Sequence, residues 1–220
     1  MEDLAFIRKH ITKEFLELIP LIERHKKAQI EMRKSDRRIK TFETKYNFIE
    51  SITKIGASGD ILATAIKRLL KETGFTKVVH FKDKRQKTKR EDLQAHYEND
   101  LFIIEVKGLS APEPKRYHII QIIPYVNGNI NRYSDKSVYG LTILNLDNAQ
   151  VINNRKQTFK NSEFETDLIN SKISCISIID LLLYFRDLKK GIITFEELIN
   201  ELKKYGLLTY GSKGGKTLKI

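Results

Sequence analysis

The sequence predicts a mixed α/β (α+β) fold, αβββαβ, in which a helix, three strands, a second helix and a fourth strand build a mixed central sheet. Two observations predict it. An apolar run at 101–104 follows a turn at 98–100 and a short strand opened by Asp92, which is the pattern of a hairpin whose second strand is buried on both faces. A helical pattern at 61–71 precedes this hairpin, and another strand pattern follows it at 137–146.

An N-terminal helical arm is expected at 1–52, before a domain at 53–210 and a C-terminal tail at 211–220. Apolar residues recur every three or four positions between 3 and 22, which is typical of an amphipathic helix, and Pro20 predicts a kink or restart. The basic residues that follow are Arg24, Lys26, Lys27, Arg33, Lys34, Arg37, Arg38 and Lys40. This pattern leaves four uses open: a strut packed on the core, a dimerisation helix, a limb that contacts phosphates, or a solvated basic face.

The first core helix is expected at 61–71, after a turn at 56–60, and Gly74 ends it in the usual way. The first strand is expected at 76–81. A basic loop follows at 82–90 and leads to Asp92. A charged loop is usually just solvated, but beside a metal site it would attract a polyanionic substrate.

After the hairpin, two prolines and Gly108 predict a loop, and a helical pattern at 115–126 carries Gln121. Pro124 interrupts this pattern, and the run Asn-Gly-Asn at 127–129 predicts a turn. Beyond the strand at 137–146, a strand at 175–179 and helices at 180–188 and 194–205 are expected to pad the sheet, the last helix ending at Gly206.

Charged residues gather at one end of the predicted hairpin. Glu105 and Lys107 are two apart on a strand, so their side chains project to the same face, and an antiparallel partner strand brings Asp92 near the same end. Two carboxylates suit Mg²⁺, which usually keeps several waters for a phosphate substrate. The lysine could orient or deprotonate a water, or stabilise charge on the phosphate. The alternative for a lone Glu-x-Lys is an ordinary ion pair.

The net charge of +12 makes a polyanion the natural partner, either nucleic acid or an anionic membrane surface. The single cysteine, Cys175, excludes an intramolecular disulfide and a cysteine-rich zinc site. No signal peptide and no membrane-spanning run is visible, so a cytoplasmic location is expected, with nucleic acid and not a membrane as the expected partner.

The segment from Asp92 to Lys107, with the element order around it, resembles the PD-(D/E)xK nuclease superfamily, which has the restriction-endonuclease-like fold. The resemblance covers roughly residues 56–155. It implies that Asp92 and Glu105 are the metal ligands, for Mg²⁺ with Mn²⁺ as a substitute, and that Lys107 is the catalytic lysine. It also implies a site-facing role for Gln121 in orienting water or holding a phosphate oxygen, with a surface position as the alternative.

The sequence departs from the family at the first core helix, where Ala63 occupies the position of a glutamate. A third acidic ligand would then be missing, unless Asp60, one turn earlier, replaces it; Asp60 could equally be an ordinary helix cap. Arg155 matches an arginine that follows the last core strand in similar nucleases, where a structural or phosphate-binding role is expected.

The leading hypothesis is therefore a metal-dependent endonuclease that hydrolyses phosphodiester bonds in DNA, in restriction or phage defence. RNA stays open as a substrate, and so does a homodimer through the N-terminal helix. The alternative is an inactive nuclease-fold module that binds nucleic acid or assembles a larger complex. The residues expected to bind nucleic acid are Lys84, Arg85, Lys87, Lys89, Arg90 and Arg155.

Overall fold

A computed structural model describes residues 2–81, 91–156 and 162–211. The chain divides into two compact units, Met1–Asn47 and Phe48–Ile220. The division falls five residues before the arm boundary predicted at 52/53. The predicted basic loop at 82–90 lies outside the described residues, and so do Lys84, Arg85, Lys87, Lys89 and Arg90 within it.

The first unit is helical. Helix α1 (Glu2–Thr53) runs through Pro20, so the restart predicted there does not occur. The last turns of α1 belong to the second unit, where Phe48 and Ile52 are buried. None of the described helices has the length and apolar character that crossing a bilayer requires.

The second unit is built on one six-stranded sheet with its strands in sequence order. The strands are β1 (Lys77–His80), β2 (Leu93–Tyr97), β3 (Asp100–Gly108), β4 (Ser137–Asn145), β5 (Ile173–Ser177) and β6 (Gly206–Leu208). The first three pair antiparallel, and β4, β5 and β6 continue the sheet in parallel from β3. The predicted mixed sheet and αβββαβ order are confirmed.

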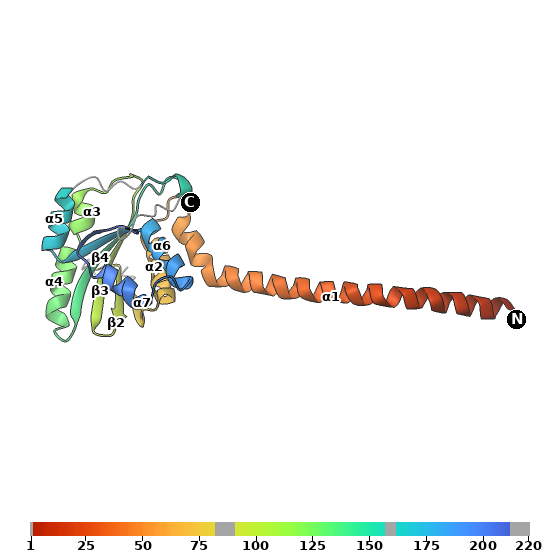
Figure 1. The fold of residues 1–220 in the computed structure, drawn as a ribbon. Helices are drawn as coiled ribbons and strands as arrows, with labels where there is room; N and C mark the ends of the chain where they lie inside the picture. The colour runs from red at the N-terminus through yellow and green to blue at the C-terminus, as the bar shows by residue number, and fades with distance from the viewer. Residues whose placement is uncertain (1, 82–90, 157–161, 212–220) are drawn as a thin grey trace. The chain divides into compact units, whose positions relative to one another are not determined.

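Helices cover both faces of this sheet (Figure 1). They are α2 (Gly59–Thr73), α3 (Arg116–Ile120), α4 (Ile123–Arg132), α5 (Ser162–Asn170), α6 (Ile178–Lys189) and α7 (Phe195–Leu202). Helices α3, α4 and α5 lie on one side and α2 and α6 on the other. A core on the first side joins Leu101 and Ile103 of β3 to Ile119 of α3, Val126 of α4 and Ile122 between the two helices. Odd-numbered residues of β3 therefore face α3 and α4.

The start of α2 is fixed against the end of β3. Gly108 is needed there, because a Cβ at this position would lie 2.3 Å from the carbonyl oxygen of Ala57. That same oxygen accepts hydrogen bonds from the side-chain amides of Asn145 and Asn148, both at 3.0 Å. The first turn of α2 is thus held beside the carboxyl ends of β3 and β4.

Three local predictions were wrong. The run Asn-Gly-Asn at 127–129 lies inside α4 and forms no turn, because Asn129 is buried and its amide donates to the carbonyl of Tyr125 at 2.8 Å. The helix predicted at 115–126 is two helices, and Gln121 caps the first of them. The last helix ends at Leu202, and Gly206 instead begins β6, which was not expected; neither was α5.

Candidate metal centre

Asp92 lies between two strands at the open end of the hairpin. Its carbonyl oxygen accepts from the Phe81 amide and its own amide donates to Ile104, both at 3.1 Å. Leu93 pairs with Ile104, so one further step of the register places Asp92 opposite Glu105. The Asp92 carboxylate turns toward β3 and accepts from the Val106 amide at 2.8 Å.

Glu105 and Lys107 project together from the face of β3 that α3 and α4 cover. The Lys107 ammonium lies 2.6 Å from Oε1 of Glu105, and the Gln121 side-chain amide donates to the same oxygen. The Glu105 side chain is 5% exposed, whereas that of Lys107 is 31% exposed. The structure therefore brings Asp92, Glu105, Lys107 and Gln121 together, and Gln121 holds the glutamate.

The second carboxylate oxygen of Glu105 has no partner. Oε2 is buried and accepts no hydrogen bond from any residue that the structure describes. A buried acceptor without a partner usually costs about 1–3 kcal/mol, more when it is charged. An oxygen in this condition beside another carboxylate fits a cation ligand.

Burial raises the pKa of both carboxyl groups. For Glu105 the charge of Asp92 adds to the rise, and the Lys107 and Gln121 contacts oppose it. For Asp92 the Val106 amide, Lys107 and His80 oppose the rise, and Asp60 adds to it. Two buried acids that disfavour each other's ionised form are stabilised by a cation, since its charge offsets both burial and repulsion.

The donor set therefore fits Mg²⁺ or Mn²⁺. The described residues contain no cluster of three or more His, Cys, Asp and Glu side chains that could hold a metal. Mg²⁺ does not need one, since one or two carboxylates with waters and a substrate phosphate commonly complete its shell. Asp92 and Glu105 would supply those two carboxylates.

The comparisons with known proteins agree with this topology. No protein-family model matches the sequence, and no curated protein does. Two solved structures match 74% of this chain at 15% identity: restriction endonuclease FokI, with a TM-score of 0.51, and FokI bound to DNA, with a TM-score of 0.52. The chain has a restriction-endonuclease-like fold. The match spans 30% of each FokI chain.

This fold brings further polar residues to the centre that the sequence analysis missed. Buried Glu91 accepts from the amides of Gln94 at 2.5 Å and Asn129 at 3.3 Å. Burial raises the pKa of Tyr125, and the negative charges of Glu105, Asp92 and Glu91 raise it further. A spacing signal existed, because Tyr125 follows Gln121 by four residues, which is about one helical turn.

Helix α2 lies on the other side of the sheet and carries Asp60 in its first turn. Ala63 occupies the position at which the resemblance predicted a glutamate. Ala63 is buried and offers no ligand. Asp60 Oδ1 lies 3.1 Å from Nε2 of His80, and its charge raises the pKa of Asp92. Ser58 occupies the cap position of α2. Asp60 is therefore close enough to influence the centre electrostatically.

Arg155 needs a correction. It is 8% exposed, and its guanidinium donates to Oδ1 of Asn145 at 2.7 Å, to the carbonyl of Gln150 at 3.0 Å and to that of Thr53 at 2.7 Å. These contacts tie the segment after β4 to the end of α1 inside the domain. The structural role fits this position, and the phosphate-binding role expected for Arg155 does not, because its donors point into the chain.

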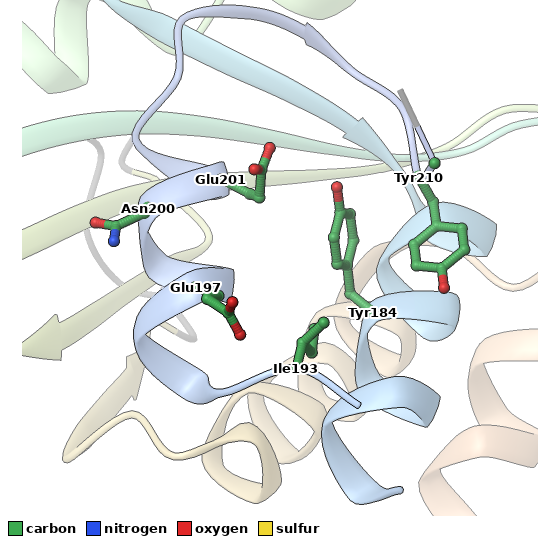
Figure 2. A pocket seen from close by; sticks show the side chains of 7 residues that line it. Tyr184, Ile193, Glu197, Asn200, Glu201 and Tyr210 are labelled. Atoms are coloured by element: carbon green, nitrogen blue, oxygen red, sulfur yellow. The ribbon is translucent and has the colours of Figure 1, made fainter. Parts of the chain in front are cut away.

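A hollow of about 480 Å³ lies between α6 and α7, lined by residues from outside the motif. Figure 2 shows the rings of Tyr184 and Tyr210 on one side of it and Glu197 and Glu201 on the other. Glu197 accepts from the Thr194 amide at 2.7 Å, and Glu201 pairs with a lysine. Both acids are thus used within the chain, and the hollow adds nothing to the metal centre.

Proposed function

We propose that the protein is a metal-dependent endonuclease that hydrolyses phosphodiester bonds in DNA with Mg²⁺, for which Mn²⁺ can substitute. The observation that carries the proposal is the partnerless oxygen Oε2 of Glu105, buried opposite Asp92 and beside Lys107. An ordinary Glu-Lys ion pair would satisfy its carboxylate within the chain. Here one oxygen is paired and the other is left for a ligand.

Each residue of the centre has a separate role in the proposed reaction. A bound divalent ion lowers the pKa of a water and polarises the scissile phosphate. Asp92 and Glu105 hold that ion, and Gln121 fixes the orientation of Glu105 through Oε1. The partly exposed Lys107 ammonium would stabilise charge that develops on the phosphate, and its neutral amine form would accept the proton of the attacking water. Gln121 thus positions a ligand, where the sequence suggested that it orients water or holds a phosphate oxygen.

DNA is the proposed substrate. The net charge of +12 favours a polyanion, and one of the matched structures is an enzyme bound to DNA. The proposed bounds are an arm at 1–52, a nuclease domain at 53–210 and a tail at 211–220. Restriction or phage defence is the proposed setting, and RNA as a substrate and a cytoplasmic location stay predictions.

The test is cleavage of plasmid and linear DNA with Mg²⁺ or Mn²⁺. We expect the wild type to cut and Glu105→Gln and Lys107→Ala to lose at least about a hundredfold in rate, in the range of general acid–base and electrostatic contributions. Lys77→Ala is the matched control, because Lys77 is exposed at the start of β1. Equal cleavage by all four proteins would contradict the assignment.

A second function is favoured by Ala63, which leaves the first core helix without its glutamate. In that case the domain binds nucleic acid, or assembles a larger complex, without cutting. Calorimetric titration with Mn²⁺ separates the two. The nuclease gives a binding isotherm that Asp92→Asn abolishes, whereas the inactive module gives DNA binding with steep salt dependence and no metal isotherm.

A further inference from the structure

In the described part of α1, several large apolar side chains are exposed to solvent. Leu21 is 57%, Met32 62% and Ile39 52% exposed within the first unit. Isolated helices in water gain little stability from local interactions, and most helices in proteins are stabilised by packing an apolar face. A helix of 52 residues with such side chains needs a partner for that face.

These side chains follow a seven-residue repeat. With positions labelled a to g and Met32 placed at a, an apolar seam of a and d positions runs along the helix. Its members from 21 to 46 are Leu21, His25, Ala28, Met32, Ser35, Ile39, Phe42 and Tyr46. By sequence alone the same repeat extends back through Leu18, Ile11, Ile7 and Leu4, with Glu14 at one intervening d position. A sustained repeat of this kind is the sequence pattern of a coiled coil.

The seam ends where the helix enters the second unit. Phe48 and Ile52 are buried in the domain core and occupy the c and g positions, off the seam. The face that serves the domain is therefore a different one from the face that carries Met32 and Ile39. The seam is not a continuation of the domain core.

Charge is arranged to permit pairing with an identical helix. Most of the basic residues between 21 and 46 fall at the outer positions b, c and f. They are Lys26, Lys27, Arg33, Lys34, Arg37 and Lys40. Their mutual repulsion is therefore directed into solvent and away from the seam.

The positions beside the seam also select an orientation. Between residues 24 and 50 the g positions are mostly basic and the e positions mostly acidic, with Arg38 and Lys45 at g and Glu43 and Glu50 at e. In a parallel pair each g residue meets the e residue five positions later on the other helix, so Arg38 meets Glu43 and Lys45 meets Glu50. An antiparallel pair would bring g to g and e to e, which opposes mostly like charges. Glu31 and Asp36 are the like-charged pair in the parallel case, and Lys34 offsets it through its 2.8 Å contact with Glu31.

We propose that α1 pairs with α1 of a second copy of this chain as a parallel, in-register, two-stranded coiled coil with Met32 and Ile39 in its seam. The polar seam residues His25 and Ser35 fix the register, since a shifted pairing would bury them against apolar side chains. The proposal goes beyond the phosphodiesterase activity, and its test does not depend on that activity.

The chain offers a matched pair of variants. Ile39 lies at a, and Ile30 lies at the outer position f; both are 52% exposed. Sedimentation velocity of the full chain at micromolar concentration should give a mass twice that of one chain for the wild type and for Ile30→Lys, and a single-chain mass for Ile39→Lys. A monomeric wild type, or two lysine variants of equal mass, overturns the proposal.

Orientation is tested by cross-linking. Ser35→Cys places a thiol at d, where a parallel in-register pair brings two copies together, and Thr41→Cys places one at the outer position c. Cys175 is buried and does not interfere. Mild oxidation should give a covalent dimer with Ser35→Cys and none with Thr41→Cys. A dimer that fails to cross-link at Ser35 refutes the parallel arrangement.

Discussion

Glu105→Gln should stabilise the metal-free protein while removing metal binding. In the wild type the glutamate Oε2 is buried without a partner, and the pKa of Glu105 is raised by burial and by Asp92. The amide keeps an oxygen to accept from Lys107 and Gln121, and it places a neutral NH₂ group where the partnerless oxygen stood. The repulsion with Asp92 disappears with the charge.

The size of the effect follows from these contacts. Removal of the unpaired charge from this buried position is worth about 2 kcal/mol, within the range of about 1–3 kcal/mol for a buried unpaired group. Loss of the charge-assisted bond to Lys107 costs about 1 kcal/mol, and screening limits it because that side chain is nearly one third exposed. The net gain of about 1 kcal/mol raises Tm by roughly 2–4 °C for a protein of this size.

The assay is thermal unfolding with EDTA and with excess Mn²⁺. At a hundred times Kd the metal stabilises the wild type by about 2.7 kcal/mol and the variant not at all, so the order of the two melting temperatures reverses. The gain without metal is largest above the raised pKa of folded Glu105. It shrinks as pH falls through that pKa toward the ordinary value of 4.5, because the wild-type carboxyl then becomes neutral as well.

The matched control is Asp100→Asn on the same strand. The Asp100 carboxylate is also buried, but it is paired with Lys203, so the amide should lower stability. If Glu105→Gln melts below the wild type in EDTA at pH 8, then the reasoning about its partnerless oxygen is wrong.

Three further predictions test contacts elsewhere in the domain. Gly108→Ala should lower the free energy of unfolding by about 1–3 kcal/mol, because its Cβ would meet a backbone oxygen at 2.3 Å. Gly128→Ala, whose Cβ would have nothing within 4 Å, should raise the free energy of unfolding by about 1 kcal/mol, because alanine favours the helical state of α4. Urea denaturation measures both. Arg155→Lys should lower the free energy of unfolding by about 2–3 kcal/mol, because it leaves buried acceptors unpaired. The affinity for DNA, measured by fluorescence anisotropy, should not change. A matching loss of affinity would contradict the structural role of Arg155. Asp60→Asn should lower the pKa of Asp92 and move the pH midpoint of Mn²⁺ binding downward; an unmoved midpoint would mean that the Asp60 charge does not reach the centre.

The features that follow from strand periodicity could be predicted from the sequence. The two-residue alternation set Glu105 and Lys107 on one face, and the short turn before β3 set Asp92 opposite them. These are local rules, in which the side-chain directions follow from the number of residues alone. The hairpin and the order of the core elements were confirmed for that reason.

Features that depend on distant partners were not accessible in the same way. Asn129 looks like a turn residue by local propensity, but it lies in α4 because its side-chain amide donates to the carbonyl of Tyr125 and to Glu91, which precedes β2. Arg155 resembled a surface cation until the fold placed the carbonyl of Thr53 and the side chain of Asn145 around it. No spacing rule relates residues so far apart in the chain.

The hairpin between β2 and β3 also has a consequence for how the protein folds. Its strands are joined by Glu98 and Asn99 alone, and hairpins of this kind close in about 1–10 μs. The strands β4, β5 and β6 join through long parallel crossovers, which form slowly.

We therefore expect the two acids to meet early, while water still hydrates them, and to lose that water when α3 and α4 dock. The cost of burying the two charges would then arise in this docking step. Divalent cations present during refolding should accelerate this docking step and leave the closing of the hairpin unchanged.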